Sequence, residues 1–247
     1  MKTYRAVIFD LFDTLVDFDR TQIPVVKTDG REVRTTAGET YKVLARYAGL
    51  LAFETYYHTL SEITQELLAI RERDHLEIPA RRRYEMLLER LGMPKGDAAE
   101  QCIDAMLATH HRYMVQATVC PAERIRVLDA LKLRYPLGLL SNFDSTETGM
   151  KILTKHGLRD YFRPIHISEA IRYRKPRPEA FLQTADAMGV MPADVLFIGD
   201  TFALDVVGAK RAGMDAAWFD RQKTPPDLEA AQPDYVIARF TDLLEIL

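Results

Sequence analysis

Short apolar stretches alternate with segments of helical pattern through the second half of this chain, and this alternation restricts the fold more than any other feature. The apolar stretches span 137–140, 165–167, 195–198 and 216–219, and each has the length of a strand. Because helical segments separate them, they are typical of βαβ units, which build a parallel sheet. The sequence therefore predicts an α/β fold for this half.

A further strand is predicted at the opposite end of the chain, over residues 6–9. The stretch Ala-Val-Ile-Phe is apolar at every position, which is typical of a central strand of a parallel sheet, buried on both faces. Because one parallel strand cannot bury itself alone, it must join the sheet of the second half. Asp10 then lies at its carboxyl end, which is where ligands bind in open α/β sheets.

Between these two parts, the pattern from about residue 35 to residue 117 is almost entirely helical. Apolar residues recur at intervals of three and four over 41–48, 56–70, 84–91 and 103–114. We expect these four amphipathic helices to form a small bundle, inserted after the first strand. The predicted domains are a core of residues 1–17 and 118–247 and a helical domain of residues 18–117.

The composition excludes several classes of function. With 47% hydrophobic and 28% charged residues, the chain has the composition of a soluble globular protein. No apolar run approaches the roughly 18 residues of a membrane span, and no signal-peptide pattern precedes the first strand, so a cytoplasmic location is expected. The formal net charge of −3 provides no field that would attract nucleic acid. A small molecule is the expected partner, and the oligomeric state is left open.

Polar residues follow four of the predicted elements, at points that should meet in space. They are Asp10 with Phe12, Asp13 and Thr14; Ser141 and Asn142; Lys175; and Asp200 with Asp205. Because the carboxyl ends of parallel strands lie at one edge of a sheet, we expect these residues to converge there. At such an edge, Asp10, Asp200 and Asp205 with hydroxyl groups and a lysine suit a divalent cation beside an anionic group such as phosphate.

Four segments around these residues resemble, in order, the motifs of the haloacid dehalogenase-like hydrolase superfamily. They are DLFDTL at 10–15, LLSN at 139–142, RKPRPEAF at 174–181 and GDTFALD at 199–205. The resemblance covers the whole chain, and it implies a doubly wound, Rossmann-like parallel sheet with an inserted helical cap. Most members of that family are magnesium-dependent phosphatases. The resemblance therefore implies Mg²⁺ as cofactor and a small phosphorylated metabolite as substrate.

The resemblance also implies a catalytic and metal-binding role for five residues. Asp10 would be the nucleophile that forms an aspartyl-phosphate. Mg²⁺ would be held by Asp10, the backbone carbonyl of Phe12 and Asp200, with Asp205 a ligand directly or through water. Lys175 would neutralise the charge of both the nucleophile and the phosphate.

Three further residues are implied to surround the phosphate. Ser141 and backbone N–H groups near Asn142 would donate hydrogen bonds to the phosphate oxygens, and Thr14 would support the loop around them. Alone, Ser141 and Asn142 are explained as well by a turn or a helix cap. Their expected position beside Asp10 makes them candidates for the site.

Position 12 departs from the family pattern. The usual motif has a second acid two residues after the nucleophile, which protonates the leaving group and later deprotonates water, and here that position is Phe12. Asp13 is an acid one place later, but the period of a strand directs it to the other side. Losing a general acid costs about 10²–10⁴ in rate, which matters most for alkyl phosphates.

The aromatic residue at position 12 leaves two alternatives open. The 2-haloacid dehalogenases of the same superfamily have an aromatic residue there, and in that case Asp10 would attack carbon without a metal. That branch lacks the paired acids of the last motif, whereas Asp200 and Asp205 are both present. A non-catalytic phosphate-binding or regulatory protein is the other alternative. The sequence favours an enzyme, a magnesium-dependent phosphohydrolase ahead of a dehalogenase.

Overall fold

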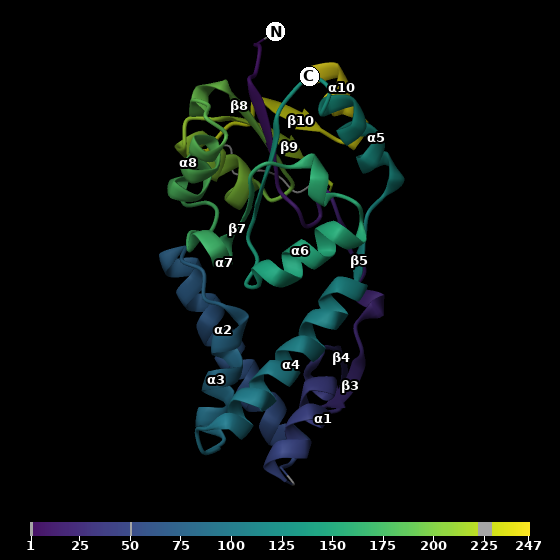
Figure 1. The fold of residues 1–247 in the computed structure, drawn as a ribbon, viewed down its shortest axis with the longest axis vertical. Helices are drawn as coiled ribbons and strands as arrows, with labels where there is room; N and C mark the ends of the chain where they lie inside the picture. The colour runs from purple at the N-terminus through teal and green to yellow at the C-terminus, as the bar shows by residue number, and fades with distance from the viewer. Residues whose placement is uncertain (1, 50, 222–228) are drawn as a thin grey trace. The chain divides into compact units, whose positions relative to one another are not determined.

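The computed structural model of this chain describes residues 2–49, 51–221 and 229–247, and contacts divide the chain into two compact units (Figure 1). The first, here called the core unit, comprises Met1–Phe18, His75–Glu77 and Val119–Leu247. The second, here called the helical unit, comprises Asp19–Asp74 and Ile78–Thr118. The chain therefore leaves the core unit after Phe18, and returns to it for three residues in the middle of the insertion.

Within the described residues, the core unit is built on a six-stranded parallel sheet of order β10-β9-β8-β1-β6-β7. The strands are β1 (Ala6–Phe9), β6 (Leu137–Ser141), β7 (Ile165–Ile167), β8 (Val195–Gly199), β9 (Asp215–Phe219) and β10 (Tyr235–Ile237). Strand β1 lies between β6 and β8, and all four of its residues are buried. The doubly wound α/β fold predicted from the sequence is confirmed, with the N-terminal strand inside the sheet.

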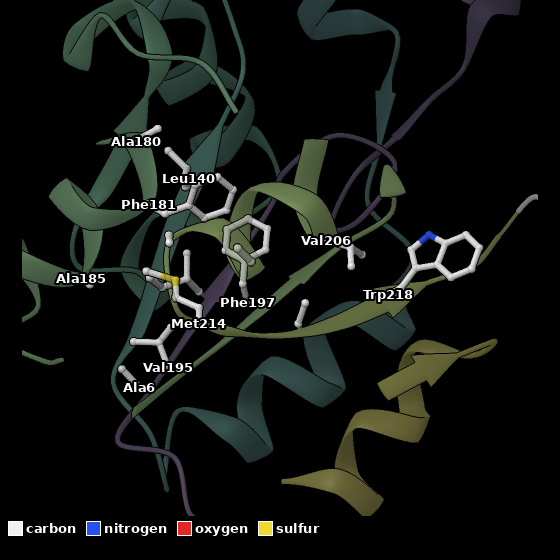
Figure 2. Close-up of a cluster of buried hydrophobic side chains, with 14 residues drawn as sticks. Ala6, Leu140, Ala180, Phe181, Ala185, Val195, Phe197, Val206, Met214 and Trp218 are labelled. Atoms are coloured by element: carbon white, nitrogen blue, oxygen red, sulfur yellow. The ribbon is translucent and has the colours of Figure 1, made fainter. Parts of the chain in front are cut away.

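Helices and apolar side chains cover the sheet on its two faces. The helices of the core unit are α5 (Ala122–Leu131), α6 (Thr146–Lys155), α7 (Ser168–Ile171), α8 (Pro178–Ala187), α9 (Val207–Arg211) and α10 (Leu243–Ile246). On one face, Phe181 of α8 meets Phe197 of β8 with ring centroids 4.8 Å apart, inside the apolar cluster shown in Figure 2. On the other, Phe9 packs against Phe162 and Phe240. These two layers hold the strand ends that carry the polar residues.

The helical unit contains the four helices that the sequence predicts. They are α1 (Ala37–Ala48), α2 (Phe53–Asp74), α3 (Ala80–Arg90) and α4 (Asp97–Gln116). Each begins three to six residues before its predicted apolar repeat. Their buried side chains, among them Tyr56, Ile63, Leu87 and Met106, form one apolar cluster. Neither these helices nor any other in the described parts of the chain is long and apolar enough to cross a membrane.

Two short sheets of two strands each were not predicted. In the helical unit, β3 (Val25–Thr28) and β4 (Arg31–Arg34) form an antiparallel hairpin that precedes α1. The other sheet pairs β2 (Asp17–Phe18) with β5 (Thr118–Val119), at the two ends of the insertion.

Candidate active site

A buried lysine joins two carboxylates at the carboxyl end of the sheet. Lys175 Nζ lies 2.5 Å from Asp10 Oδ1 and 2.6 Å from Asp205 Oδ1, and the three side chains are 3%, 9% and 2% exposed. The Asp10 N–H donates to the Ile198 carbonyl at 2.9 Å, so Asp10 directly extends the β1–β8 ladder. Buried charges are tolerated when they are paired, and here the pairing joins segments 165 residues apart.

Three carboxylates converge at this point, and the single positive charge of Lys175 cannot neutralise all three. One oxygen from each of Asp10, Asp200 and Asp205 lies within 4.8 Å of the others. Burial, together with repulsion from Asp10 and Asp205, raises the pKa of Asp200 to about 7. Burial also raises the pKa of Asp205, against the opposing effect of Lys175. This set of hard oxygen ligands fits a divalent cation such as Mg²⁺, which would remove the repulsion.

The segment after β8 fixes the positions of Asp200 and Asp205. Asp205 lies in a single π-helical turn, η4 (Phe202–Val206), and its Oδ2 accepts the Thr201 N–H at 2.9 Å. The indole N–H of Trp218 donates to the Asp200 carbonyl at 2.9 Å, which holds the backbone there. The hydroxyl of Thr14, implied to support the loop around the phosphate, donates to Asp200 Oδ1 at 3.5 Å. From the sequence, Trp218 was interpreted as a packing residue, and this hydrogen bond was not predicted.

Ser141 and Asn142, at the end of β6, occupy different surroundings. The Ser141 side chain is fully buried, and its Oγ has no hydrogen-bond partner among the described residues. A buried hydroxyl without a partner is costly, so this group is ready to bond to a ligand oxygen. The Asn142 amide instead bonds twice to the backbone of Lys175: its Nδ2 donates to the Lys175 carbonyl at 2.9 Å, and its Oδ1 accepts the Lys175 N–H at 2.8 Å. Asn142 therefore orients the loop that carries the lysine.

The turn after Asp10 places the aromatic ring of Phe12 at the site, and it directs the Asp13 carboxylate toward Arg221. The half-buried Phe12 ring packs against Phe143, with centroids 5.0 Å apart. Asp13 has a φ of 57°, and its carboxylate lies 3.6 Å from Arg221 Nη1. The same guanidinium donates to the Asp13 carbonyl at 2.8 Å and to Asp17 Oδ1 at 2.6 Å. Neither Phe143 nor Arg221 was identified from the sequence.

Comparison with known proteins agrees with this geometry. A family model described as haloacid dehalogenase-like hydrolase matches residues 4–213. The chain belongs to this family. It is therefore assigned as an enzyme, a hydrolase, in preference to the non-catalytic alternative considered from the sequence.

Individual relatives cover nearly the whole hydrolase. It is 29% identical to glyceraldehyde 3-phosphate phosphatase from Pyrococcus furiosus, over 100% of this chain and 94% of that protein. It is 26% identical to N-acylneuraminate-9-phosphatase from Mus musculus, over 98% and 93%. A solved 2-haloacid dehalogenase from Pseudomonas syringae pv. Tomato DC3000 matches with a TM-score of 0.73 at 24% identity, over 99% of this chain and 98% of that one. This last likeness shows the shared fold.

Proposed function

We propose that this hydrolase is a Mg²⁺-dependent phosphatase that acts on a small phosphorylated metabolite through an aspartyl-phosphate on Asp10. The observation that carries the proposal is the group of three carboxylates around one buried lysine, with the carboxylate oxygens within 4.8 Å of one another. The relatives named as phosphatases, at 26% to 29% identity, support the same reaction class.

The ligand set for the cation would be the carboxylates of Asp10, Asp200 and Asp205 and the backbone carbonyl of Phe12. All four groups are oxygen donors, which Mg²⁺ prefers. When bound, Mg²⁺ would supply positive charge that offsets the repulsion between the Asp10 carboxylate and the phosphate oxygens. Burial and the neighbouring carboxylates raise the pKa of Asp200. This supports the proposal that the site needs the positive charge of a cation.

The residues of the chain would carry out two displacements. One oxygen of Asp10 forms a bond to phosphorus as the bond from phosphorus to the leaving oxygen breaks, giving an aspartyl-phosphate. Lys175 pairs with Asp10 and balances the added charge, and the unpartnered Ser141 hydroxyl donates to a phosphoryl oxygen. Water then attacks phosphorus, the bond to Asp10 breaks, and inorganic phosphate leaves.

The aromatic residue at position 12 would restrict the leaving group. Phe12 has no proton to donate, and the Asp13 carboxylate faces Arg221. A leaving group that departs as a stable anion, such as a phenolate or a carboxylate, needs no general acid. We therefore expect aryl and acyl phosphates to be cleaved faster than alkyl phosphates.

A 2-haloacid dehalogenase is the second candidate, and Phe12 is the observation that favours it. In that reaction Asp10 would attack carbon, and halide would leave without protonation. That reaction does not require further carboxylates beside the nucleophile, whereas Asp200 and Asp205 both lie beside Asp10. This excess of carboxylates favours the phosphatase.

One parallel assay separates the candidates. The purified protein is incubated with p-nitrophenyl phosphate and with acetyl phosphate, each with Mg²⁺ and with chelator, and with 2-chloropropionate. We expect phosphate release that requires Mg²⁺ and is abolished in D10N. Chloride release that persists with chelator would replace the proposal by the dehalogenase.

A further inference from the structure

The loop between α2 and α3 belongs to the core unit, although both helices belong to the helical unit. Its residues His75–Glu77 lie antiparallel to Arg172–Arg174, with an isolated bridge between Leu76 and Tyr173. The Glu77 N–H donates to the Arg172 carbonyl at 2.7 Å, and the Arg174 N–H donates to the His75 carbonyl at 2.9 Å. The inserted tripeptide is thus paired with the segment that directly precedes Lys175.

The side chain of Glu77 is a buried carboxylate that the sequence analysis did not single out. It is 1% exposed and forms an ion pair with Arg174. It also accepts a hydrogen bond from Ser168 Oγ at 2.5 Å, and that oxygen in turn accepts the Phe143 N–H at 2.9 Å. A buried carboxylate is retained when both its charge and its hydrogen bonds are satisfied, which is the case here.

These contacts close a ring around the backbone of Lys175. From Glu77, one path runs through Arg174 to the adjacent Lys175. The other runs through Ser168 to Phe143 and its neighbour Asn142, whose amide bonds twice to the Lys175 backbone. The two paths meet at Glu77. Its loss would remove one side-chain contact from the segment before the lysine and one from the segment that holds the lysine backbone, and would leave the backbone hydrogen bonds of both in place.

We propose that Glu77 is a positioning residue, through which the inserted sequence holds Lys175 Nζ between Asp10 and Asp205. This inference rests on the proposed phosphatase function for its catalytic consequence. Catalytic groups must be held close to their productive geometry, and displacement by about 1 Å costs on the order of 100-fold in rate. Glu77 acts through its contacts with Arg174 and Ser168.

The test compares E77Q with a carboxylate of similar chemistry elsewhere in the core unit. Asp215 is the matched control, since it also pairs with a cation, Lys2, and accepts a hydrogen bond from a hydroxyl, that of Tyr4. We expect both E77Q and D215N to lower the melting temperature. Only E77Q should lower kcat for p-nitrophenyl phosphate with saturating Mg²⁺, by about 10- to 100-fold. The double variant E77Q/R174Q should lose less than the sum of the two single losses, because the ion pair is shared, while the contact of Glu77 with Ser168 is left to add a smaller loss of its own.

Two results would overturn the positioning role. One is a folded E77Q with the kcat of the wild type, and the other is an equal fall of kcat in D215N. If E77Q does not fold, S168A breaks the ring at one hydrogen bond and is judged by the same criteria. A wild-type protein without Mg²⁺-dependent phosphate release overturns the proposed function instead. In that case crystal structures of the wild type and E77Q decide, and a Lys175–Asp10 pair that is unchanged in E77Q overturns the positioning role.

Discussion

Gly199 and Asp205 approach each other so closely that a Cβ at residue 199 would overlap the carboxyl group of Asp205. Gly199 is the last residue of β8, and Asp205 lies in the π-helical turn that follows. The absent side chain leaves the space in which the carboxylate sits beside Lys175. The glycine of the GDTFALD segment is thus explained by packing against an acid of the same segment.

G199A should therefore displace Asp205 and weaken cation binding. We expect the Mg²⁺ concentration for half-maximal activity to rise, and overpacking to cost about 1–3 kcal/mol of unfolding free energy. Mg²⁺ titration of activity and urea denaturation measure the two effects. G138A is the control, because its Cβ would meet the flexible end of Met188, with Sδ at 2.7 Å. Wild-type Mg²⁺ dependence in G199A would contradict the role given to this close contact.

The metal-free protein should lose stability as the pH rises from about 4 to about 7. Burial and neighbouring carboxylates raise the pKa of Asp200 to about 7, above the value of about 3.9 for an aspartate in an unfolded chain. A raised pKa in the folded state means that the folded protein binds more protons, so stability is present at low pH and is lost as the pH rises through that pKa. Urea denaturation at each pH with chelator measures this slope. We expect D200N to flatten it and Mg²⁺ to restore stability at pH 8, whereas a slope that D200N leaves unchanged would assign the effect to other groups.

The sheet was predictable because its central strands are buried on both faces and read as continuous apolar runs. The edge strand β10 escaped prediction, since it pairs only with β9 and its Val236 is 60% exposed. The hairpin of β3 and β4 also lacks a clear apolar pattern. Its one signal is the dipeptide Asp29-Gly30, whose φ values of 50° and 70° are those of a type I′ turn.

The candidate site was predictable to the extent that it follows from strand ends. Asp10, Lys175 and Asp205 converge because parallel strands bring their carboxyl ends to one edge. The pairing of Asn142 with the Lys175 backbone and the docking of Glu77 depend on how two loops meet. No local pattern of residue types encodes such a meeting, so these contacts were found only in the structure.

F12D should increase the hydrolysis of alkyl phosphates relative to aryl phosphates. The substitution supplies a carboxyl group at the position where the family pattern has its general acid, and such a group is worth about 10²–10⁴ in rate when well placed. The ratio of kcat/KM for glycerol phosphate to that for p-nitrophenyl phosphate measures the effect, and we expect it to rise. F12N is the matched control, with similar size and polarity but no proton to donate. An equal rise in F12N would show that the aromatic ring, and not the missing acid, restricts the wild type.

R221Q should weaken Mg²⁺ binding with little loss of stability. Arg221 joins the segment after β9 to the turn after β1, through the Asp13 carbonyl at 2.8 Å and the Asp17 carboxylate at 2.6 Å. That turn carries the Phe12 carbonyl, so its loosening should raise the Mg²⁺ concentration for half-maximal activity. Because the ion pair is about one-third exposed, its loss should cost only about 0–1 kcal/mol of unfolding free energy. R239Q, which removes an exposed pair with Asp242 in the same unit, should leave the Mg²⁺ dependence unchanged. If R221Q matches R239Q in both measurements, the Phe12–Val16 bridge and the hydrogen bonds to Leu11 suffice to hold the turn.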